Sequence, residues 1–160
     1  MARFNHRNLA KFVESFDIKD SEGKNTHVIV LEFCNDGDLD SYIRAYGGKE
    51  ENLGTFIDIF VQIWEGVKSL HAQGLVHSDL KPANIFLHRE GRTGPLIAKV
   101  GDFGVANWLP DGEASLLVGG AGTWPYMAPE RLTRNKFGKR SDIYALGTIL
   151  YEMLYKRMAF

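Results

Sequence analysis

The stretch LVHSDLKPANIFL, residues 75–87, holds an acid, a lysine and an amide within six positions of one another. Asp79, Lys81 and Asn84 supply these three groups on one predicted loop. A fixed carboxylate can orient or deprotonate an alcohol, a lysine beside it can neutralise a transferred phosphate, and an amide oxygen can ligate Mg²⁺. The loop therefore predicts a site for phosphate chemistry.

A second stretch, KVGDFGVA at residues 99–106, places Asp102 between a predicted strand and a glycine. There a carboxylate can reach a metal without obstruction by the backbone. Taken singly, Asp-Phe-Gly is usually a turn, Ala-Pro-Glu at 128–130 is usually a helix start, and Asp79 would more often be a helix cap. Their occurrence in one order, with an asparagine five residues after Asp79, is much more specific than any single match.

In this order the motifs resemble the signature of eukaryotic-type protein kinases, and the resemblance extends over the whole chain. Lys81 in DLKPAN and Thr123 in GTWPYMAPE are similar to the serine/threonine-specific version. The resemblance implies an α+β, protein-kinase-like fold with a mainly helical large lobe and a partial small-lobe sheet, truncated at both ends. It implies one partial domain, with residues 1–33 as the small-lobe remnant, 34–38 as the hinge and 39–160 as the large lobe.

The resemblance also implies roles for the residues of the two loops. Asp79 becomes the catalytic acid–base residue, and Lys81 steadies the γ-phosphate. Asn84 and Asp102 hold Mg²⁺, and Thr123 forms a hydrogen bond near Asp79 and Lys81. ATP and Mg²⁺ are therefore the expected cosubstrate and metal.

Residues 28–34, VIVLEFC, resemble the last small-lobe strand running into the hinge. By this resemblance Leu31 is the gatekeeper, and the backbone of Glu32 and Cys34 meets the adenine. Asp38 is expected to contact the ribose and Leu87 to form the floor under the adenine.

Supporting residues follow from the same resemblance. Asp142 is expected to anchor the catalytic loop from the start of a buried helix. Phe12, His77 and Phe103 fall where the hydrophobic spine of the family lies.

Residue patterns predict the elements between these motifs. Stretches 12–18 and 27–33 are rich in β-branched and aromatic residues and flank turn chemistry, which predicts an antiparallel hairpin. Apolar residues at three- and four-residue spacing predict one helix from Leu39, capped by Asp38 and stopped at Gly47, and a longer one over 55–71. The longer stripe is expected to comprise Phe56, Phe60, Ile63, Trp64, Val67 and Leu70. A further helix opening at Ser141 is apolar on nearly every side, which predicts a fully buried element.

The composition excludes several classes of protein. With 19 basic and 20 acidic side chains, the net charge of −1 predicts neither a nucleic-acid stripe nor a polybasic membrane patch. Cys34 is the single cysteine, so no internal disulfide can form. No apolar run reaches the length of a membrane span. We expect an intracellular, cytoplasmic protein whose partners are ATP and a protein substrate with Ser or Thr, with no nucleic acid and no membrane segment.

One departure from the family pattern concerns regulation. Ser78 stands where many members carry an arginine that pairs with a phosphate on the activation loop. The position at which the family often carries that phosphate is Gly119, and Ser115 is the one hydroxyl between Asp102 and Thr123. We therefore expect activation that does not depend on a phosphate held by this loop.

A second departure concerns the small lobe. No Gly-x-Gly-x-x-Gly loop precedes residue 12, and no Val-Ala-x-Lys strand is present. The chain is thus expected to begin downstream of half of the phosphate clamp and to be nearly inactive and poorly soluble alone. A serine/threonine kinase is the leading interpretation, a non-catalytic binding scaffold is the alternative, and a small-molecule phosphotransferase is a weaker third. DLKPANIFL is similar to NIMA-related kinases, although nine residues do not assign a subfamily.

Overall fold

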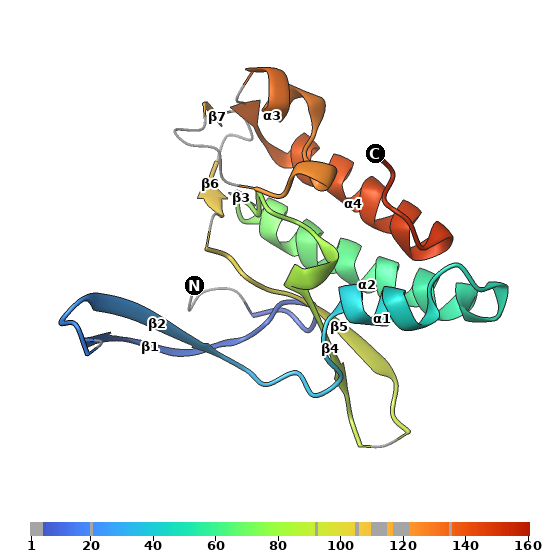
Figure 1. Ribbon diagram of the computed structural model, residues 1–160, viewed down its shortest axis with the longest axis horizontal. Coiled ribbons are helices and arrows are strands. Elements are labelled where there is room, and N and C mark those ends of the chain that lie inside the picture. Colours follow the sequence, from blue (N-terminus) through green and yellow to red (C-terminus); the bar gives the residue numbers. More distant parts are fainter. Residues whose placement is uncertain are drawn as a thin grey trace.

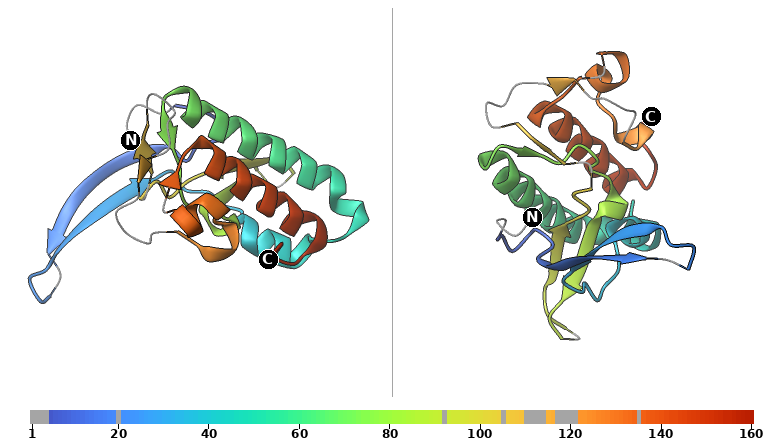
Figure 2. Two further views of the ribbon diagram at one scale, coloured as in Figure 1. Left: turned by 90° about the horizontal axis from the view of Figure 1, so that it is seen from above. Right: turned by 90° about the vertical axis from the view of Figure 1, so that its left-hand side faces the viewer.

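A computed structural model describes residues 5–19, 21–91, 93–104, 106–109, 115–116, 122–134 and 136–160. Its largest part is a helical body, and a β-hairpin extends from one side of that body (Figure 1; Figure 2, left). The α+β character expected from the sequence is confirmed.

The hairpin consists of β1 (Phe12–Lys19) and β2 (Asn25–Leu31), which pair in antiparallel fashion. It confirms the predicted hairpin, with β2 ending two residues before the predicted boundary at residue 33. Most side chains of both strands are exposed on both faces. The hairpin therefore contributes little to the core.

Helix α1 (Leu39–Tyr46) begins and ends as predicted. The side chain of Asp38 accepts a hydrogen bond from the amide of Ser41 at 2.7 Å, which satisfies one of the unpaired N–H groups of the first turn. The helix stops at Gly47, whose amide donates to the carbonyl of Ile43.

Helix α2 (Leu53–Ala72) is the central element of the body. It packs against α4 (Lys139–Tyr155) on one side and against β5 (Leu96–Val100) on another. Trp64 is 39% exposed, so this member of the expected stripe lies at the rim of the core, and Ile59 takes its place. The buried side chains recur at spacings of three and four residues: Phe56, Ile59, Ile63, Val67 and Leu70.

Helix α4 corrects one expectation. It starts at Lys139, two residues before Ser141, and it is not buried all round: Ile143 is 42% exposed. One face packs into the core, through residues that include Ala145, Leu146 and Ile149. An apolar composition alone therefore overstated its burial.

Short strands and turns complete the body. They include β3 (Leu75–Val76), β4 (Ile85–Arg89) and β5, and the last two form an antiparallel pair. The remaining elements are η1 (Glu50–Asn52), η2 (Pro82–Asn84), β6 (Asn107–Trp108), β7 (Ser115–Leu116), η3 (Trp124–Tyr126), α3 (Pro129–Arg134) and β8 (Lys136–Phe137). Among the helices in the described ranges, none has both the length and the apolar character to cross a membrane.

The segment just before the hairpin is bound to the body. The amide of Ala10 donates to the carbonyl of Val100 at 2.8 Å, and the amide of Val100 donates to the carbonyl of Asn8 at 2.9 Å. Gly66 of α2 permits this approach, because a methyl group there would lie 2.5 Å from the carbonyl oxygen of Asn8. The hairpin is thus anchored at its first strand.

Candidate active site

Asp142, in the first turn of α4, positions the loop between β3 and β4. It is 1% exposed. Its Oδ2 accepts hydrogen bonds from the amide of His77 at 2.9 Å and from Nε2 of His71 at 2.8 Å, and its Oδ1 accepts one from the amide of Ser78 at 2.9 Å. Ser78 has a φ of 69°, so this carboxylate compensates for an unfavourable backbone conformation. The predicted anchoring role of Asp142 is confirmed.

His77 ties this loop to the Asp-Phe-Gly loop. Its Nε2 donates to the carbonyl of Gly101 at 2.9 Å, and its Nδ1 accepts from the amide of Asp79 at 3.3 Å, which together assign the proton to Nε2. The rings of His77 and Phe103 lie 5.4 Å apart, as expected for two spine neighbours. The third spine residue, Phe12, is half-buried, and its role stays a prediction.

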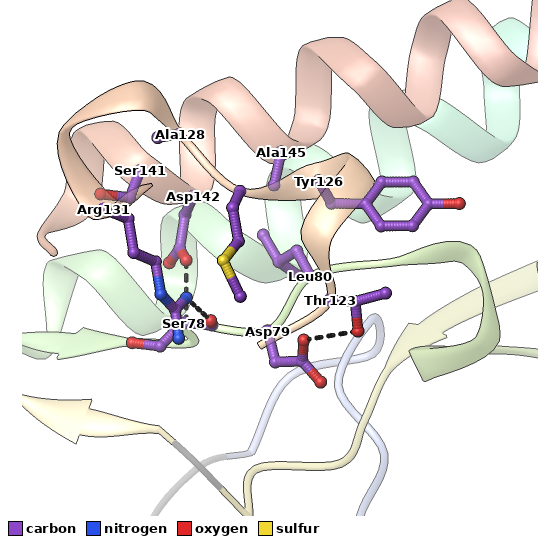
Figure 3. A pocket seen from close by; sticks show the side chains of 11 residues that line it. Ser78, Asp79, Leu80, Thr123, Tyr126, Ala128, Arg131, Ser141, Asp142 and Ala145 are labelled. Carbon is purple, nitrogen blue, oxygen red and sulfur yellow. Dashed lines mark hydrogen bonds between the residues drawn. The ribbon is translucent and has the colours of Figure 1, made fainter. Parts of the chain in front are cut away.

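The predicted catalytic side chains form one hydrogen-bonded cluster. Oγ1 of Thr123 donates to Oδ1 of Asp79 at 3.0 Å (Figure 3) and accepts from Nζ of Lys81 at 3.0 Å. Nζ of Lys81 also lies 3.1 Å from Oδ2 of Asp79. Nδ2 of Asn84 donates to the carbonyl of Asp79 at 2.9 Å and more weakly to its Oδ2 at 3.3 Å. All four residues thus share one network.

The position of Thr123 is set by the turn that follows it. Thr123 precedes η3, and the hydroxyl of Tyr126 in that turn donates to Oε2 of Glu152 in α4 at 2.6 Å. Burial and this hydrogen bond raise the pKa of Tyr126, so the hydroxyl stays a donor at neutral pH. A buried anchor on α4 thereby holds Thr123 against the catalytic loop.

Asn84 and Asp102 line one cavity and have the oxygen donors that Mg²⁺ prefers. Because Nδ2 of Asn84 donates to Asp79, its amide Oδ1 is the atom suited to a cation. Asp102 has a left-handed φ of 58°, and its Oδ1 accepts a hydrogen bond from the amide of Gly104 at 3.3 Å. Within the described ranges no cluster of three or more His, Cys, Asp or Glu residues could hold a metal. A metal here would therefore take its other ligands from water or a phosphate.

The cavity that these two residues line has a volume of about 420 Å³ and lies between the hairpin and the body. Leu31 lines it, and its role as gatekeeper stays a prediction. Leu87 does not: it is fully buried, with 0% exposure, and the neighbouring Phe86 lines the cavity instead. The expectation for Leu87 is therefore wrong, because successive side chains of a strand point to opposite faces. The lining residues are Ile29, Leu31, Ala83, Asn84, Phe86, Asp102, Phe103 and Gly104.

The remaining predicted nucleotide contacts lie along the connection that follows β2. Oε1 of Glu32 accepts from the amide of Lys11 at 2.7 Å and from Nζ of Lys99 at 3.0 Å. Burial alone would raise the pKa of Glu32, but these two hydrogen bonds hold it below its ordinary value. Burial and the charge of Glu32 raise the pKa of the Cys34 thiol. The side chain of Asp38 is engaged as the cap of α1. Glu32, Cys34 and Asp38 do not line the cavity.

Sequence reasoning missed two residues of the site. Phe86 and Leu87 are neighbours in β4, so their side chains point to opposite faces of the strand. The sequence does not say which face meets the cavity, because that depends on the register of β4. Arg131 follows Ala-Pro-Glu directly, and its Nη1 donates to the carbonyl of Ser78. The signal in the sequence that could have pointed to Arg131 is its place as a charged residue near the start of a short helix. The expectation for Gly119 falls outside the described residues, as does the side chain of Ser115.

Comparison with known proteins agrees with this geometry. A family model described as "Protein kinase domain" matches residues 1–160. The chain is similar to the interferon-induced, double-stranded RNA-activated protein kinase of Mus musculus, with 33% identity over 97% of the chain and 31% of that protein. It is also similar to the serine/threonine-protein kinase Nek5 of Mus musculus (35% identity, 96% of the chain, 23% of that protein) and to unc-51 of Caenorhabditis elegans (36%, 84% and 16%). The chain spans less than a third of the length of each of these relatives.

Proposed function

Because the chain belongs to the protein kinase family, and its curated relatives include serine/threonine kinases, we propose that the protein containing it transfers the γ-phosphate of ATP to serine or threonine hydroxyls of a protein substrate. The observation that carries the proposal is the network of Asp79, Lys81, Thr123 and Asn84, because it joins a carboxylate, a cation and an amide beside a cavity. In this proposal the chain is one partial kinase domain. Its small-lobe remnant is residues 1–33, its hinge is residues 34–38 and its large lobe is residues 39–160.

The cavity of about 420 Å³ suits a nucleotide base between apolar walls. Leu31 and Phe86 would contact the adenine, with the backbone of Glu32 and Cys34 at its edge and Asp38 toward the ribose. Asn84 and Asp102 would hold Mg²⁺, and their amide and carboxylate oxygens fit that ion. When bound, the metal neutralises charge on the phosphates.

The transfer itself follows from the network. The substrate hydroxyl oxygen forms a bond to the γ-phosphorus while the bond from that phosphorus to the bridging oxygen breaks, and ADP leaves with those electrons. The hydroxyl proton passes to Asp79, which Thr123 and Asn84 hold in place. Lys81 lies 3.1 Å from the carboxylate and faces the charge of the transferred group.

Asp79→Asn tests this proposal most directly. We expect kcat for a Ser/Thr peptide to fall by about 10²–10⁴-fold, because the base is removed, while the Kd for Mg·ATP changes little. The measurement combines radiolabelled phosphate transfer by the full-length protein with calorimetric titration of Mg·ATP.

The matched control is Asp58→Asn, an exposed acid on α2 far along the sequence from the site. Asp102→Asn should instead weaken Mg·ATP binding. Full phosphate transfer by the Asp79→Asn variant would contradict the role of Asp79 as the base, and no transfer by the unaltered protein would contradict the proposed activity.

A non-catalytic scaffold is a second candidate, and one observation favours it: among the described residues, no lysine or arginine lines the nucleotide cavity. A chain that binds a protein partner yet shows no heat with Mg·ATP would support the scaffold. A cytoplasmic location and the lack of nucleic-acid binding stay predictions.

A further inference from the structure

Ser78 lies at a small buried cavity between the catalytic loop and the segment that begins at Gly122. It is 3% exposed, and its Oγ makes no hydrogen bond with any residue in the described part of the chain. Ser78 and Arg131 line the same small cavity, whose volume is about 10 Å³, roughly that of a single water molecule. Little room is therefore left for a long side chain at position 78 while Arg131 occupies its observed place.

Arg131 reaches this space from α3. It is 8% exposed, and its Nη1 donates a hydrogen bond to the carbonyl of Ser78 (Figure 3). Its guanidinium also lies against Gly122, because a methyl group at Gly122 would lie 2.8 Å from Nη2 of Arg131. One side chain thus contacts both the catalytic loop and the residue that precedes Thr123.

The charges around Arg131 favour this placement. The guanidinium faces the carboxylates of Asp79 and Asp142, which lie in the catalytic loop and at the start of α4. Burial lowers the pKa of Arg131, and the two carboxylates counteract that effect. An arginine retains its charge at neutral pH, so α3 holds a permanent cation against the catalytic loop. Because the group is buried and already paired, it is poorly placed to receive an external phosphate.

We propose that Arg131 is a positioning residue that locks the segment from Gly122 through α3 onto the catalytic loop, so that the substrate groove is ordered without a phosphate on the activation segment. It does so from the small cavity that it lines together with Ser78. This inference rests on the proposed kinase function. It explains how a chain with Ser78 keeps Thr123 within 3.0 Å of Asp79.

Arg131→Met, which keeps an unbranched stem but removes the guanidinium and its charge, tests the proposal in the full-length protein. We expect kcat/KM for a Ser/Thr peptide to fall by about 10- to 100-fold, because Thr123 and Asp79 lose their alignment. The KM for ATP should change less than about 2-fold, since other residues line the nucleotide cavity. Arg131→Lys should recover part of the loss, and phosphatase treatment of the unaltered protein should have no effect.

A double variant separates positioning from simple destabilisation. Ser78→Arg alone should lower activity and stability, because two guanidinium groups would compete for one space. Ser78→Arg combined with Arg131→Met should be more active than either single variant, and this non-additivity is the signature of a shared site. If Arg131→Met does not fold, this double variant still gives the comparison.

Controls distinguish the two proposals. Arg140→Met removes an exposed arginine of α4, nine residues after Arg131, and should leave kcat/KM unchanged. Activity of Arg131→Met equal to that of Arg140→Met, or a many-fold loss in the unaltered protein after phosphatase, would overturn the role of Arg131. Absence of ATP-dependent phosphate transfer by the unaltered protein would instead overturn the kinase function.

Discussion

The catalytic loop, residues 77–84 between β3 and β4, and the β1–β2 hairpin are stabilised in opposite ways. The loop is buried, and distant residues satisfy its polar groups: Asp142 lies 65 positions from His77 and Gly101 lies 24 positions from it. The hairpin is exposed, and its stability comes from the local ladder between β1 and β2. An irregular loop can thus be held more firmly than a regular hairpin when buried hydrogen-bonding groups anchor it.

The exposed hairpin carries apolar side chains that an isolated strand pair does not need. Val13, Phe16, Ile18 and Ile29 are between 42% and 56% exposed. β-Branched and aromatic residues favour strands, so local propensity accounts for the hairpin without burial. Because the hairpin is a two-stranded sheet, the outer backbone edges of β1 and β2 are open to pairing with other strands.

Asp142→Ala is expected to have the largest effect on this comparison. The substitution leaves the buried amides of His77 and Ser78 and the ring of His71 without their acceptor. We expect the free energy of unfolding to fall by about 3–5 kcal/mol, measured by urea denaturation. Asp58→Ala, at an exposed position of α2, is the matched control. An equal, small loss for both variants would show that the loop is held by something other than this carboxylate.

Glu32→Gln, at the base of the hairpin, should have an intermediate effect. Because the pKa of Glu32 is lowered in the folded chain, its ion pair with Lys99 stabilises the fold above the unfolded pKa of about 4.3. That stabilisation is lost as the pH falls through the still lower folded value. The pair is partly exposed and screened, so we expect a loss of less than about 1 kcal/mol at pH 7.

The measurement for Glu32→Gln is chemical denaturation at pH 7 and at pH 3. The difference between the variant and the unaltered chain should shrink at the lower pH. A difference that grows on acidification would contradict the assigned direction of the pKa shift.

Phe16→Thr should have the smallest effect. Phe16 is 44% exposed, and threonine is a good strand former, so we expect the free energy of unfolding of the 160-residue chain to change by no more than about 0.5 kcal/mol. Phe56→Thr is the matched control, because Phe56 is 1% exposed in the core of α2 and its loss should cost about 3–5 kcal/mol. Similar costs at both positions would mean that the hairpin face is covered in solution.

The same contrast explains what could be predicted from sequence. The motifs of the catalytic loop carry their chemistry in residue type and order, so Asp79, Lys81, Asn84 and Thr123 were expected together, and they lie together. Elements with local signals, among them the hairpin, α1 and α2, are also expected within a few residues of their bounds.

The errors arise where a contact depends on register or on distant packing. Phe86 and Leu87 are adjacent and both apolar, and only the pairing of β4 with β5 decides which one faces the cavity. Arg131 contacts Ser78 across 53 positions, which no local pattern encodes. The partial exposure of α4 at Ile143 depends likewise on which elements pack beside it, not on its own composition.

The two anchored ends of the hairpin restrict how it can move. The amide of Glu32 donates to the carbonyl of Lys11 at 2.9 Å, and Nζ of Lys99 holds both Oε1 of Glu32 and the carbonyl of Arg7 at 3.0 Å. Ile29 and Leu31 line the cavity from β2, and Asn84 lines it from the body. The hydrogen bonds at the base of the hairpin therefore also fix the distance between the two walls of the cavity.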